Sequence, residues 1–326
     1  MHYLMEKIDL KDRKILYELD QNSRQSVSQI GKKVGLHKNV VQYRINRLIE
    51  KKVISNFYTV IDSFKLGYNS VRFYIVYQNT YPEIRREIID YFVKNKYTWW
   101  VGSFEGDFDL AVVIWIKELD DFYILWEKTL QKYHQYFQKQ IFASYVELML
   151  YRHSFLLDLP DKTDRKHVGL IGGRKYDGAD DVDFQILNLL ASNARISTSE
   201  IAKNLNLTFE TIKNRIKNLI KINIIQGFRV DIDYRKLGYH FFKININLND
   251  YKKRTWIIKY IKNNPHLIMI DKSIGYYDLE LEFYLKDLNQ FHQIMDDLVT
   301  KFPGIIKNYT YVHDVQAHKI LYLPTV

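Results

Sequence analysis

Apolar residues recur along the chain with two spacings that follow each other in a fixed order. Over the first 50 residues they stand three or four positions apart, which predicts three short amphipathic helices. From residue 53 the spacing changes to two, which predicts strands, and strands then alternate with two further helices in the order βαββαβ. The pattern therefore predicts a helical unit followed by a ferredoxin-like unit.

The same succession of elements occurs twice. Residues 12–68 align without a gap with residues 183–239, and about 23 aligned positions are identical, which is too many for chance. Further along, the hairpin sequence GDFDL at 106–110 matches GYYDL at 275–279. The predicted fold class is α+β, with two copies of a winged helix-turn-helix followed by a βαββαβ domain.

The repeat also sets the domain boundaries. The first copy is predicted to hold a winged helix-turn-helix at 1–62 and a βαββαβ domain at 63–157. The second copy holds the same pair at 180–233 and 234–326. Residues 158–179 are rich in Gly, Asp and charge and have no sustained period, which predicts a linker.

Capping signals mark the helix starts in both copies. The first helix opens on an acidic cap, Asp9 or Asp180, and the second helix on a capping box, Ser26-Val-Ser-Gln29 or Ser197-Thr-Ser-Glu200. A tight turn then leads into the third helix, which completes the helix-turn-helix outline. The alternating segments that follow, VISNFYTVID and IIQGFRVDID, predict a short ribbon, or wing.

One face of the third helix carries polar side chains in its N-terminal half, the part that a recognition helix presents to bases. Lys donates to guanine, Asn and Gln pair with adenine, and Arg provides phosphate-binding charge. The candidate DNA-binding residues of the first copy are His37, Lys38, Asn39, Gln42, Tyr43, Arg44, Asn46 and Arg47. A basic helix face is often only a solvated face, but the caps, the turn and the duplication favour DNA binding.

The third helix of the second copy has a different surface. Phe209 and Glu210 stand where the first copy has Lys38 and Asn39. The candidate DNA-binding residues that remain are Thr208, Lys213, Asn214, Arg215 and Lys217. This helix either reads a different half-site or has become a module for positioning or protein contact. As an N-cap, Thr208 is a better residue than its counterpart His37.

Composition supports a polyanionic partner. The net charge is +10 and the pI about 9.3, which favours double-stranded DNA through long-range attraction and counterion release. The chain contains no Cys, its opening residues are charged, and it has no apolar run of membrane-spanning length. We therefore expect a cytoplasmic protein with no membrane contact, no metal site and no cofactor.

These motifs resemble the leucine-responsive regulator/AsnC (Lrp/AsnC) family of archaeal and bacterial transcription factors. The resemblance covers nearly the whole chain, twice, and is most specific in the two helix-turn-helix segments and the two hairpins. It implies a βαββαβ domain that senses a ligand and dimerises, and a protein regulated by an amino acid or similar effector. Because two units are fused here, the chain is expected to form an intramolecular pseudo-dimer, a homo-oligomer, or both.

The resemblance also implies an effector-binding role for the hairpin residues Gly106, Asp109, Gly275 and Asp278. A glycine lets a ligand approach the backbone, and an aspartate can pair with a ligand ammonium group. The alternative is structural: the glycines make the hairpin turn and the aspartates cap it. The residues themselves leave both interpretations open.

Two other functions compete with specific regulation. Some haem-pathway decarboxylases are similar in fold, but they carry a strand-borne motif of the His-Asn-Tyr type, whereas the equivalent strands here read YTWWVGSF and HLIMIDKS. With no catalytic motif present, the chain is expected not to be an enzyme. An architectural protein that coats DNA would use the same helices with little sequence preference.

Overall fold

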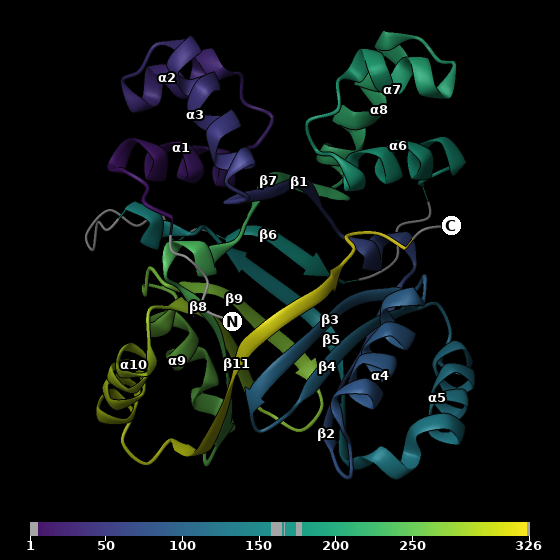
Figure 1. Cartoon of the computed structure of the whole chain (residues 1–326), viewed down its shortest axis with the longest axis vertical. Coiled ribbons are helices and arrows are strands. Elements are labelled where there is room, and N and C mark those ends of the chain that lie inside the picture. The colour runs from purple at the N-terminus through teal and green to yellow at the C-terminus, as the bar shows by residue number, and fades with distance from the viewer. Residues whose placement is uncertain (1–5, 158–164, 166, 174–177, 325–326) are drawn as a thin grey trace.

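The computed structural model describes residues 6–157, 165, 167–173 and 178–324 of the chain. Both copies of the repeat fold into the same order of elements (Figure 1). The first copy comprises α1 (Leu10–Gln21), α2 (Val27–Val34), α3 (Lys38–Glu50), β1 (Ile54–Ile61), β2 (Asn69–Tyr77), α4 (Pro82–Lys94), β3 (Thr98–Gly106), β4 (Leu110–Ile116), α5 (Leu119–Tyr133) and β5 (Phe137–Tyr151). The second comprises α6 (Asp181–Ser192), α7 (Thr198–Leu205), α8 (Phe209–Lys221), β7 (Ile225–Ile232), β8 (His240–Leu248), α9 (Arg254–Ile261), β9 (Leu267–Ile274), β10 (Leu279–Leu285), α10 (Leu288–Lys301) and β11 (Ile306–Ile320). The predicted α+β class with two copies is confirmed.

Side chains at the predicted caps begin the helices. Asp9 Oδ1 accepts from Asp12 N at 2.8 Å, while Asp9 N donates to Asp12 Oδ2 at 3.2 Å, and α6 begins with the same reciprocal box. Ser26 and Gln29 form the capping box of α2. Before α7, Ser197 Oγ accepts from the third helical residue at 3.1 Å. Each cap satisfies amide groups that have no partner within the helix.

The ribbon after each third helix differs from the expected wing. Each copy contributes one strand, and the two strands pair with each other: β1 runs antiparallel to β7, with Tyr58 opposite Arg229. A single strand leaves its amide and carbonyl groups without partners, and here the other copy provides them. The ribbon therefore lies between the two helix-turn-helix units (Figure 1).

The two βαββαβ sheets are joined into a ring. In sheet order the strands run β2-β4-β3-β11-β8-β10-β9-β5-β6, and an additional β2–β5 pairing closes the ring, with β6 (His167–Gly172) outside it. The long last strands make the junctions. β5 pairs with β2 along its first half and with β9 of the other copy along its second, and β11 pairs likewise with β8 and β3. The two copies of one chain thus pair with each other.

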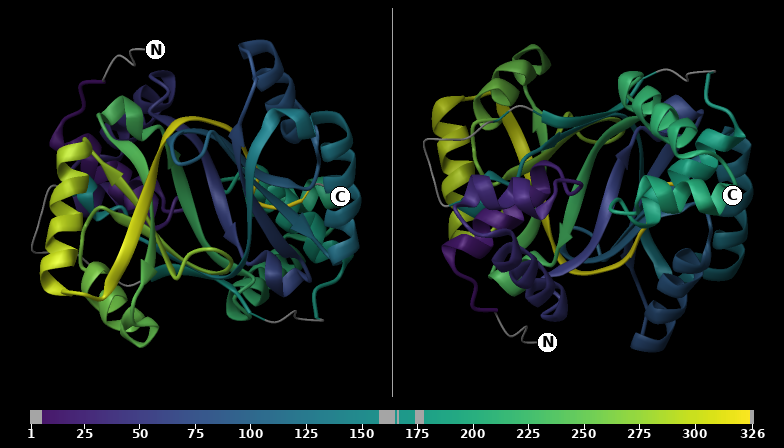
Figure 2. Two further views of the ribbon diagram at one scale, coloured as in Figure 1. Left: turned by 90° about the horizontal axis from the view of Figure 1, so that it is seen from below. Right: turned by 90° about the horizontal axis from the view of Figure 1, so that it is seen from above.

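Helices cover the outside of this ring. α4 and α5 pack on the sheet of the first copy and α9 and α10 on that of the second, on opposite sides of the molecule (Figure 1). The two helix-turn-helix units lie side by side above the strands, as the view from above shows (Figure 2). This arrangement places α3 and α8 on the same end of the molecule.

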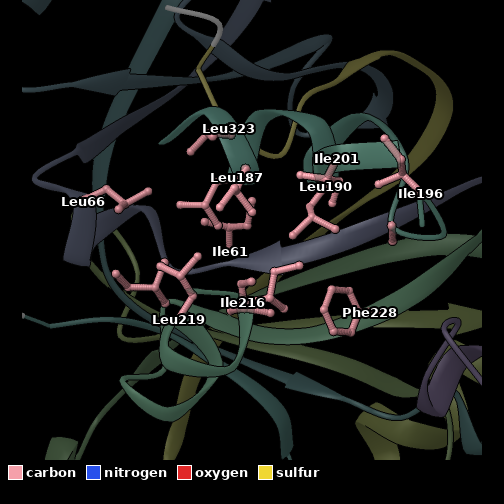
Figure 3. Close-up of a cluster of buried hydrophobic side chains, with 14 of the residues drawn as sticks. Ile61, Leu66, Leu187, Leu190, Ile196, Ile201, Ile216, Leu219, Phe228 and Leu323 are labelled. Carbon is pink, nitrogen blue, oxygen red and sulfur yellow. The ribbon is translucent and has the colours of Figure 1, made fainter. Parts of the chain in front are cut away.

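Each helix-turn-helix core is completed by the other copy. In the core of the second unit, Leu187, Leu190 and Leu219 pack with Ile61 and Leu66 of the first copy (Figure 3). The core of the first unit includes residues that follow α8, namely Val230, Ile232, Tyr234 and Tyr239. The helical units are therefore fixed to each other and to the ring below them.

The predicted linker, 158–179, contains a strand. Within it, β6 pairs with β5, and Gly172 N donates to Asp62 Oδ1 at 3.2 Å. The lack of a sustained period hid this strand because it is short and lies at a sheet edge. Residues 158–164, 166 and 174–177 of the predicted linker lie outside the described residues.

Candidate nucleic-acid interface

A cluster of charges holds α3 against α1. Arg44 donates to Asp9 at 2.8 Å and to Asp12 at 2.8 Å, and Arg47 donates to Asp12 at 2.5 Å. Asp12 is fully buried, and the side chains of Arg44 and Arg47 are only 19% and 32% exposed. Hydrogen bonds to Asp9 and Asp12 raise the pKa of Arg44. Both arginines thus help to hold α3 against α1, and their predicted contact with phosphate stays a prediction.

The second copy repeats this arrangement. Arg215 on α8 donates to Asp180 and to Asp183 at 2.9 Å in each case. Hydrogen bonds to Asp183 and Asp180 raise the pKa of Arg215. Of the two arginines in the first cluster, only Arg44 has a counterpart here, because Asn218 stands at the position of Arg47.

The remaining candidates on α3 lie on its exposed face. Gln42 Nε2 donates to Asn46 Oδ1 at 2.8 Å, one helical turn away, so that two amide side chains are held side by side. Tyr43 is 65% exposed. His37 Nδ1 accepts from Asn39 N at 3.4 Å and serves as the N-cap. The structure brings together on this face His37, Lys38, Asn39, Gln42, Tyr43 and Asn46, all of which are exposed.

The corresponding face of α8 carries other groups. Thr208 caps the helix through its hydroxyl, which accepts from the amide of the third helical residue at 3.1 Å. Lys213 donates to Glu210 at 3.2 Å, which reduces the charge that it presents outward. Phe209 is 50% exposed beside them. Asn214 and Lys217 are exposed further along the helix.

Contacts across the ribbon fix the two helical units relative to each other, and they are reciprocal. Arg24 stacks over Phe228 at 5.2 Å, and Arg195 stacks over Phe57 at 5.1 Å. Arg24 also donates to the carbonyl oxygens of the turn after α6, at 2.7 and 2.9 Å. The sequence contained a signal for these contacts, since Arg24 and Arg195 are identical positions of the repeat, but their role was not predicted.

The hairpin residues of the first copy have structural partners. Gly106 has φ +122°, and a β-carbon there would lie 2.5 Å from the carbonyl oxygen of Tyr311 on β11. Asp109 Oδ2 accepts from Tyr77 N at 2.7 Å, just where β2 ends. The glycine therefore admits the strand of the other copy, and the aspartate caps a strand.

The second hairpin is built in the same way. A β-carbon on Gly275 would lie 2.7 Å from that of Ala143 on β5. Asp278 Oδ2 accepts from Leu248 N at 2.8 Å, at the end of β8. These contacts account for all four hairpin residues without a ligand, and their predicted effector-binding role stays a prediction.

The described part of the chain contains neither a cluster of metal ligands nor a membrane-spanning helix. No group of three or more His, Asp or Glu side chains there forms a potential metal site. Nor does any described helix combine the length and the apolar character that crossing a bilayer requires.

Comparison with known proteins gives the same picture of the two helical units. Residues 8–49 match the model of the AsnC-type helix-turn-helix domain, and residues 180–226 match that of winged helix-turn-helix DNA-binding domains. An uncharacterized HTH-type transcriptional regulator of Pyrococcus furiosus is 34% identical over 133 residues, which are 41% of this chain and 89% of the relative. Another from Pyrococcus abyssi is 31% identical over 126 residues, or 38% of this chain and 85% of the relative.

Among solved structures, the siroheme decarboxylase NirDL matches over almost the whole chain. Its TM-score is 0.64 at 12% sequence identity, covering 96% of this chain and 94% of that chain. At this identity the likeness shows a shared fold and nothing of the chemistry.

Two helix-turn-helix units on one end of the molecule, each matched by a domain model, together with the named relatives define a DNA-binding transcriptional regulator. Within that class, the chain belongs to the Lrp/AsnC family, with the family's unit present twice in one polypeptide.

Proposed function

We propose that the chain recognises a specific sequence of double-stranded DNA, with α3 as the principal reading helix. The observation that carries this proposal is that α3 has two kinds of polar side chain, one held by α1 and one exposed. Arg44 and Arg47 are hydrogen-bonded to Asp12 of α1, whereas Lys38, Gln42 and the other polar candidates on α3 are exposed. Among them, Lys38 suits guanine and Gln42 suits adenine in the major groove.

We further propose that the binding site consists of two unequal halves. At the start of α8, Phe209 and Glu210 stand at the positions that Lys38 and Asn39 occupy on α3. A carboxylate accepts from cytosine and repels phosphate, so α8 does not read the half-site of α3. Because the ribbon fixes both helices in one chain, a non-palindromic site needs no second molecule.

Selection from a random pool of duplexes at near-physiological salt tests this function. We expect an enriched motif with two different half-sites. Enrichment of a single half-site would assign reading to α3 alone. Tight, salt-sensitive binding without enrichment would favour an architectural protein that coats DNA, and absence of binding would refute the proposal.

A double variant isolates base reading. Lys38→Ala/Gln42→Ala should weaken binding to the selected site far more than binding to random DNA. The matched control is Lys128→Ala/Gln131→Ala, which removes the same side-chain types from the exposed face of α5, away from the helix-turn-helix end. An equal loss on both DNAs would reduce Lys38 and Gln42 to phosphate contacts.

An amino acid or similar effector at the hairpins is the family-based part of the proposal. Asp109→Asn keeps an oxygen that can accept from Tyr77 N but removes the charge that would pair with a ligand ammonium group. If the hairpin binds an amino acid, at least one of the twenty should raise the melting temperature of the wild type and not of the variant. No rise with any of them would leave these residues with their structural roles.

Regulation is favoured over catalysis by the matched domains and the named relatives. The decarboxylase alternative is supported by fold alone. The histidine nearest the equivalent strand, His266, directs Nδ1 to the carbonyl oxygen of Tyr284 at 2.7 Å. A regulator that acts on chromosomal DNA also suits the cytoplasmic location expected from the sequence.

A further inference from the structure

Charged side chains occupy the interior of the strand ring. Arg72 on β2 donates to Asp271 at 3.0 Å and to Glu280 at 2.6 Å. Lys243 on β8 contacts Asp271 and donates to Glu282 at 2.8 Å. None of these side chains is more than about a tenth exposed. Arg72 and Lys243 are counterparts in the repeat, so the cations are shared equally between the copies.

The acids are not shared equally, because all of them belong to the second copy. The strand registers identify their counterparts in the first. In the second copy Asp271 is paired with Glu280 across the sheet, and the equivalent pair in the first copy is Gly102 and Ala111. Glu282 is paired with Lys243, and the equivalent pair is Val113 and Arg72. Gly102, Ala111 and Val113 therefore replace three carboxylates. This replacement removes the charge of three carboxylates from one side of the interior, and the Trp100 ring lies in the space beside Gly102.

A cavity lined by residues of both copies lies beside this charged network. It has a volume of about 270 Å³, just below the roughly 300–1,000 Å³ typical of small-molecule sites. Its walls are mostly apolar and aromatic, with Ala111 and Val113 beside the rings of Trp99 and Trp100. Ile320 of β11, which is 43% exposed, is also in the lining.

Two polar atoms of the lining residues form no hydrogen bond within the described part of the chain. The Tyr74 hydroxyl and Nε of Arg72 both belong to lining residues, which are 1% and 2% exposed. Neither atom forms a hydrogen bond with any of the described residues. A buried donor without a partner costs roughly 1–3 kcal/mol, so such atoms in a cavity wall indicate a place for an acceptor.

The surrounding charges select against a charged occupant. A ligand carboxylate would lie near the acids of the second copy, and a ligand ammonium would lie near Arg72 and Lys243. Burial raises the pKa of Glu282 to about 7, with Lys243 opposing the rise and Asp271 adding to it. Protonation of Glu282 leaves two acids, Asp271 and Glu280, against two cations, and the network is then neutral.

We propose that this cavity binds an uncharged, ring-sized apolar molecule with one oxygen, which accepts hydrogen bonds from the Tyr74 hydroxyl and Arg72 Nε. The site is distinct from the two hairpins, since none of Gly106, Asp109, Gly275 and Asp278 lines the cavity. β1 contributes Tyr58, Val60 and Ile61 to the lining, so an occupant touches the strand that follows α3.

Four probes with the same phenyl body test the proposal. 2-Phenylethanol, ethylbenzene, phenylacetate and 2-phenylethylamine are titrated into the full chain at pH 7 without DNA, by calorimetry and by the fluorescence of the lining tryptophans. The alcohol should bind tightest, with ethylbenzene weaker by roughly tenfold for the lost hydrogen bonds. The two charged probes should be weaker than the alcohol by at least about tenfold.

Variants locate the site. Tyr74→Phe should remove most of the preference for the alcohol over ethylbenzene, and Ala111→Leu, which fills the cavity, should abolish binding of both. Tyr77→Phe is the matched control, because it removes another buried hydroxyl without a partner, one outside the cavity. Melting curves confirm that each variant is folded, and Tyr74→Phe alone decides if Ala111→Leu does not fold.

Three outcomes would overturn the proposal: no probe binding up to its solubility, tighter binding of a charged probe than of the alcohol, or an unchanged preference in Tyr74→Phe. Since no DNA is present in the titrations, none of these outcomes bears on the proposed DNA recognition. Loss of DNA selectivity, in turn, would leave the probe titrations unaffected.

Discussion

Arg229 on β7 donates a hydrogen bond from Nε to Oδ1 of Asp20 on α1 at 2.9 Å, which joins the second copy to the first. Asp20 is fully buried and Arg229 is 3% exposed. In the repeat, Ala191 is equivalent to Asp20 and Tyr58 is equivalent to Arg229. The other half of the molecule therefore has no equivalent ion pair. The two helical units are thus attached to the shared ribbon in chemically different ways.

Removal of the carboxylate should destabilise the protein strongly. Asp20→Ala leaves a buried guanidinium without its ion partner, which lowers the free energy of unfolding by about 3–5 kcal/mol. Urea denaturation followed by circular dichroism measures the loss. Glu83→Ala is the control, since Glu83 and Arg86 form a pair whose side chains are 66% and 72% exposed, and its effect should stay below about 1 kcal/mol.

The repeat itself suggests a compensating change for the same pair. Asp20→Ala/Arg229→Tyr reproduces the Ala191 and Tyr58 combination of the other half and removes both charges together. The double variant should regain part of the stability lost in Asp20→Ala. A single-variant loss below about 1 kcal/mol, or no recovery in the double variant, would contradict a structural role for the pair.

We expect His153 to make the stability of the same region depend on pH. Burial lowers the pKa of His153 to about 3, with Asp20 opposing and Arg229 adding to the shift. In the unfolded chain the pKa is about 6.5, so between these values the unfolded state holds a proton that the folded state lacks. Stability from this group is therefore lost as the pH falls from about 6.5 towards 3.

A variant without the imidazole should show a flatter profile. Between pH 6.5 and pH 4.5, the wild type should lose stability faster than His153→Gln, by up to about 1.4 kcal/mol per pH unit. Denaturation at several pH values gives both curves. His134→Gln, which replaces an exposed histidine, should follow the wild type. Parallel curves for the wild type and His153→Gln would show that His153 does not cause the acid sensitivity.

The sequence predicted the elements well because helices and strands depend on local periodicity and caps. The capping box of α2 was found at its predicted place, whereas before α7 the structure shows only the bond from Glu200 N to Ser197 Oγ. Contacts between the two copies could not be predicted from the sequence. The pattern of a strand shows that it pairs with another strand, but it does not show which strand that is. The ribbon of β1 and β7 and the pair of Asp20 and Arg229 are contacts of this kind.

The candidate site shows the same limit at the level of side chains. Helical spacing placed Lys38 and Gln42 on the exposed face of α3, where the structure has them. The same spacing predicted that Arg44 contacts DNA. It could not show that Arg44 forms ion pairs with Asp9 and Asp12, because these residues lie more than 30 positions away in the sequence. Which cations are available to a ligand depends on such tertiary ion pairs.

This assignment of Arg44 can be tested directly. Arg44→Ala should lower the free energy of unfolding by about 1–3 kcal/mol, because the buried carboxylate of Asp12 loses one of its two hydrogen-bonded cations. Lys38→Ala, at an exposed position without such contacts, should change it by less than about 0.5 kcal/mol. Thermal denaturation distinguishes the two. If Arg44→Ala retained full stability and lost only DNA affinity, Arg44 would be a phosphate contact, as first predicted.

The last prediction concerns the difference between α3 and α8. Phe209→Lys/Glu210→Asn gives the start of α8 the two residues that start α3, and both positions are exposed, so the fold should tolerate the change. The motif selected by this variant should become more nearly palindromic, and its affinity should fall more steeply with salt, because a carboxylate has been replaced and a cation gained near phosphate. The control Lys128→Ala/Gln131→Ala should select the wild-type motif. If the motif of the Phe209→Lys/Glu210→Asn variant were also unchanged, α8 would not face the bases, and the second copy would serve to position the first.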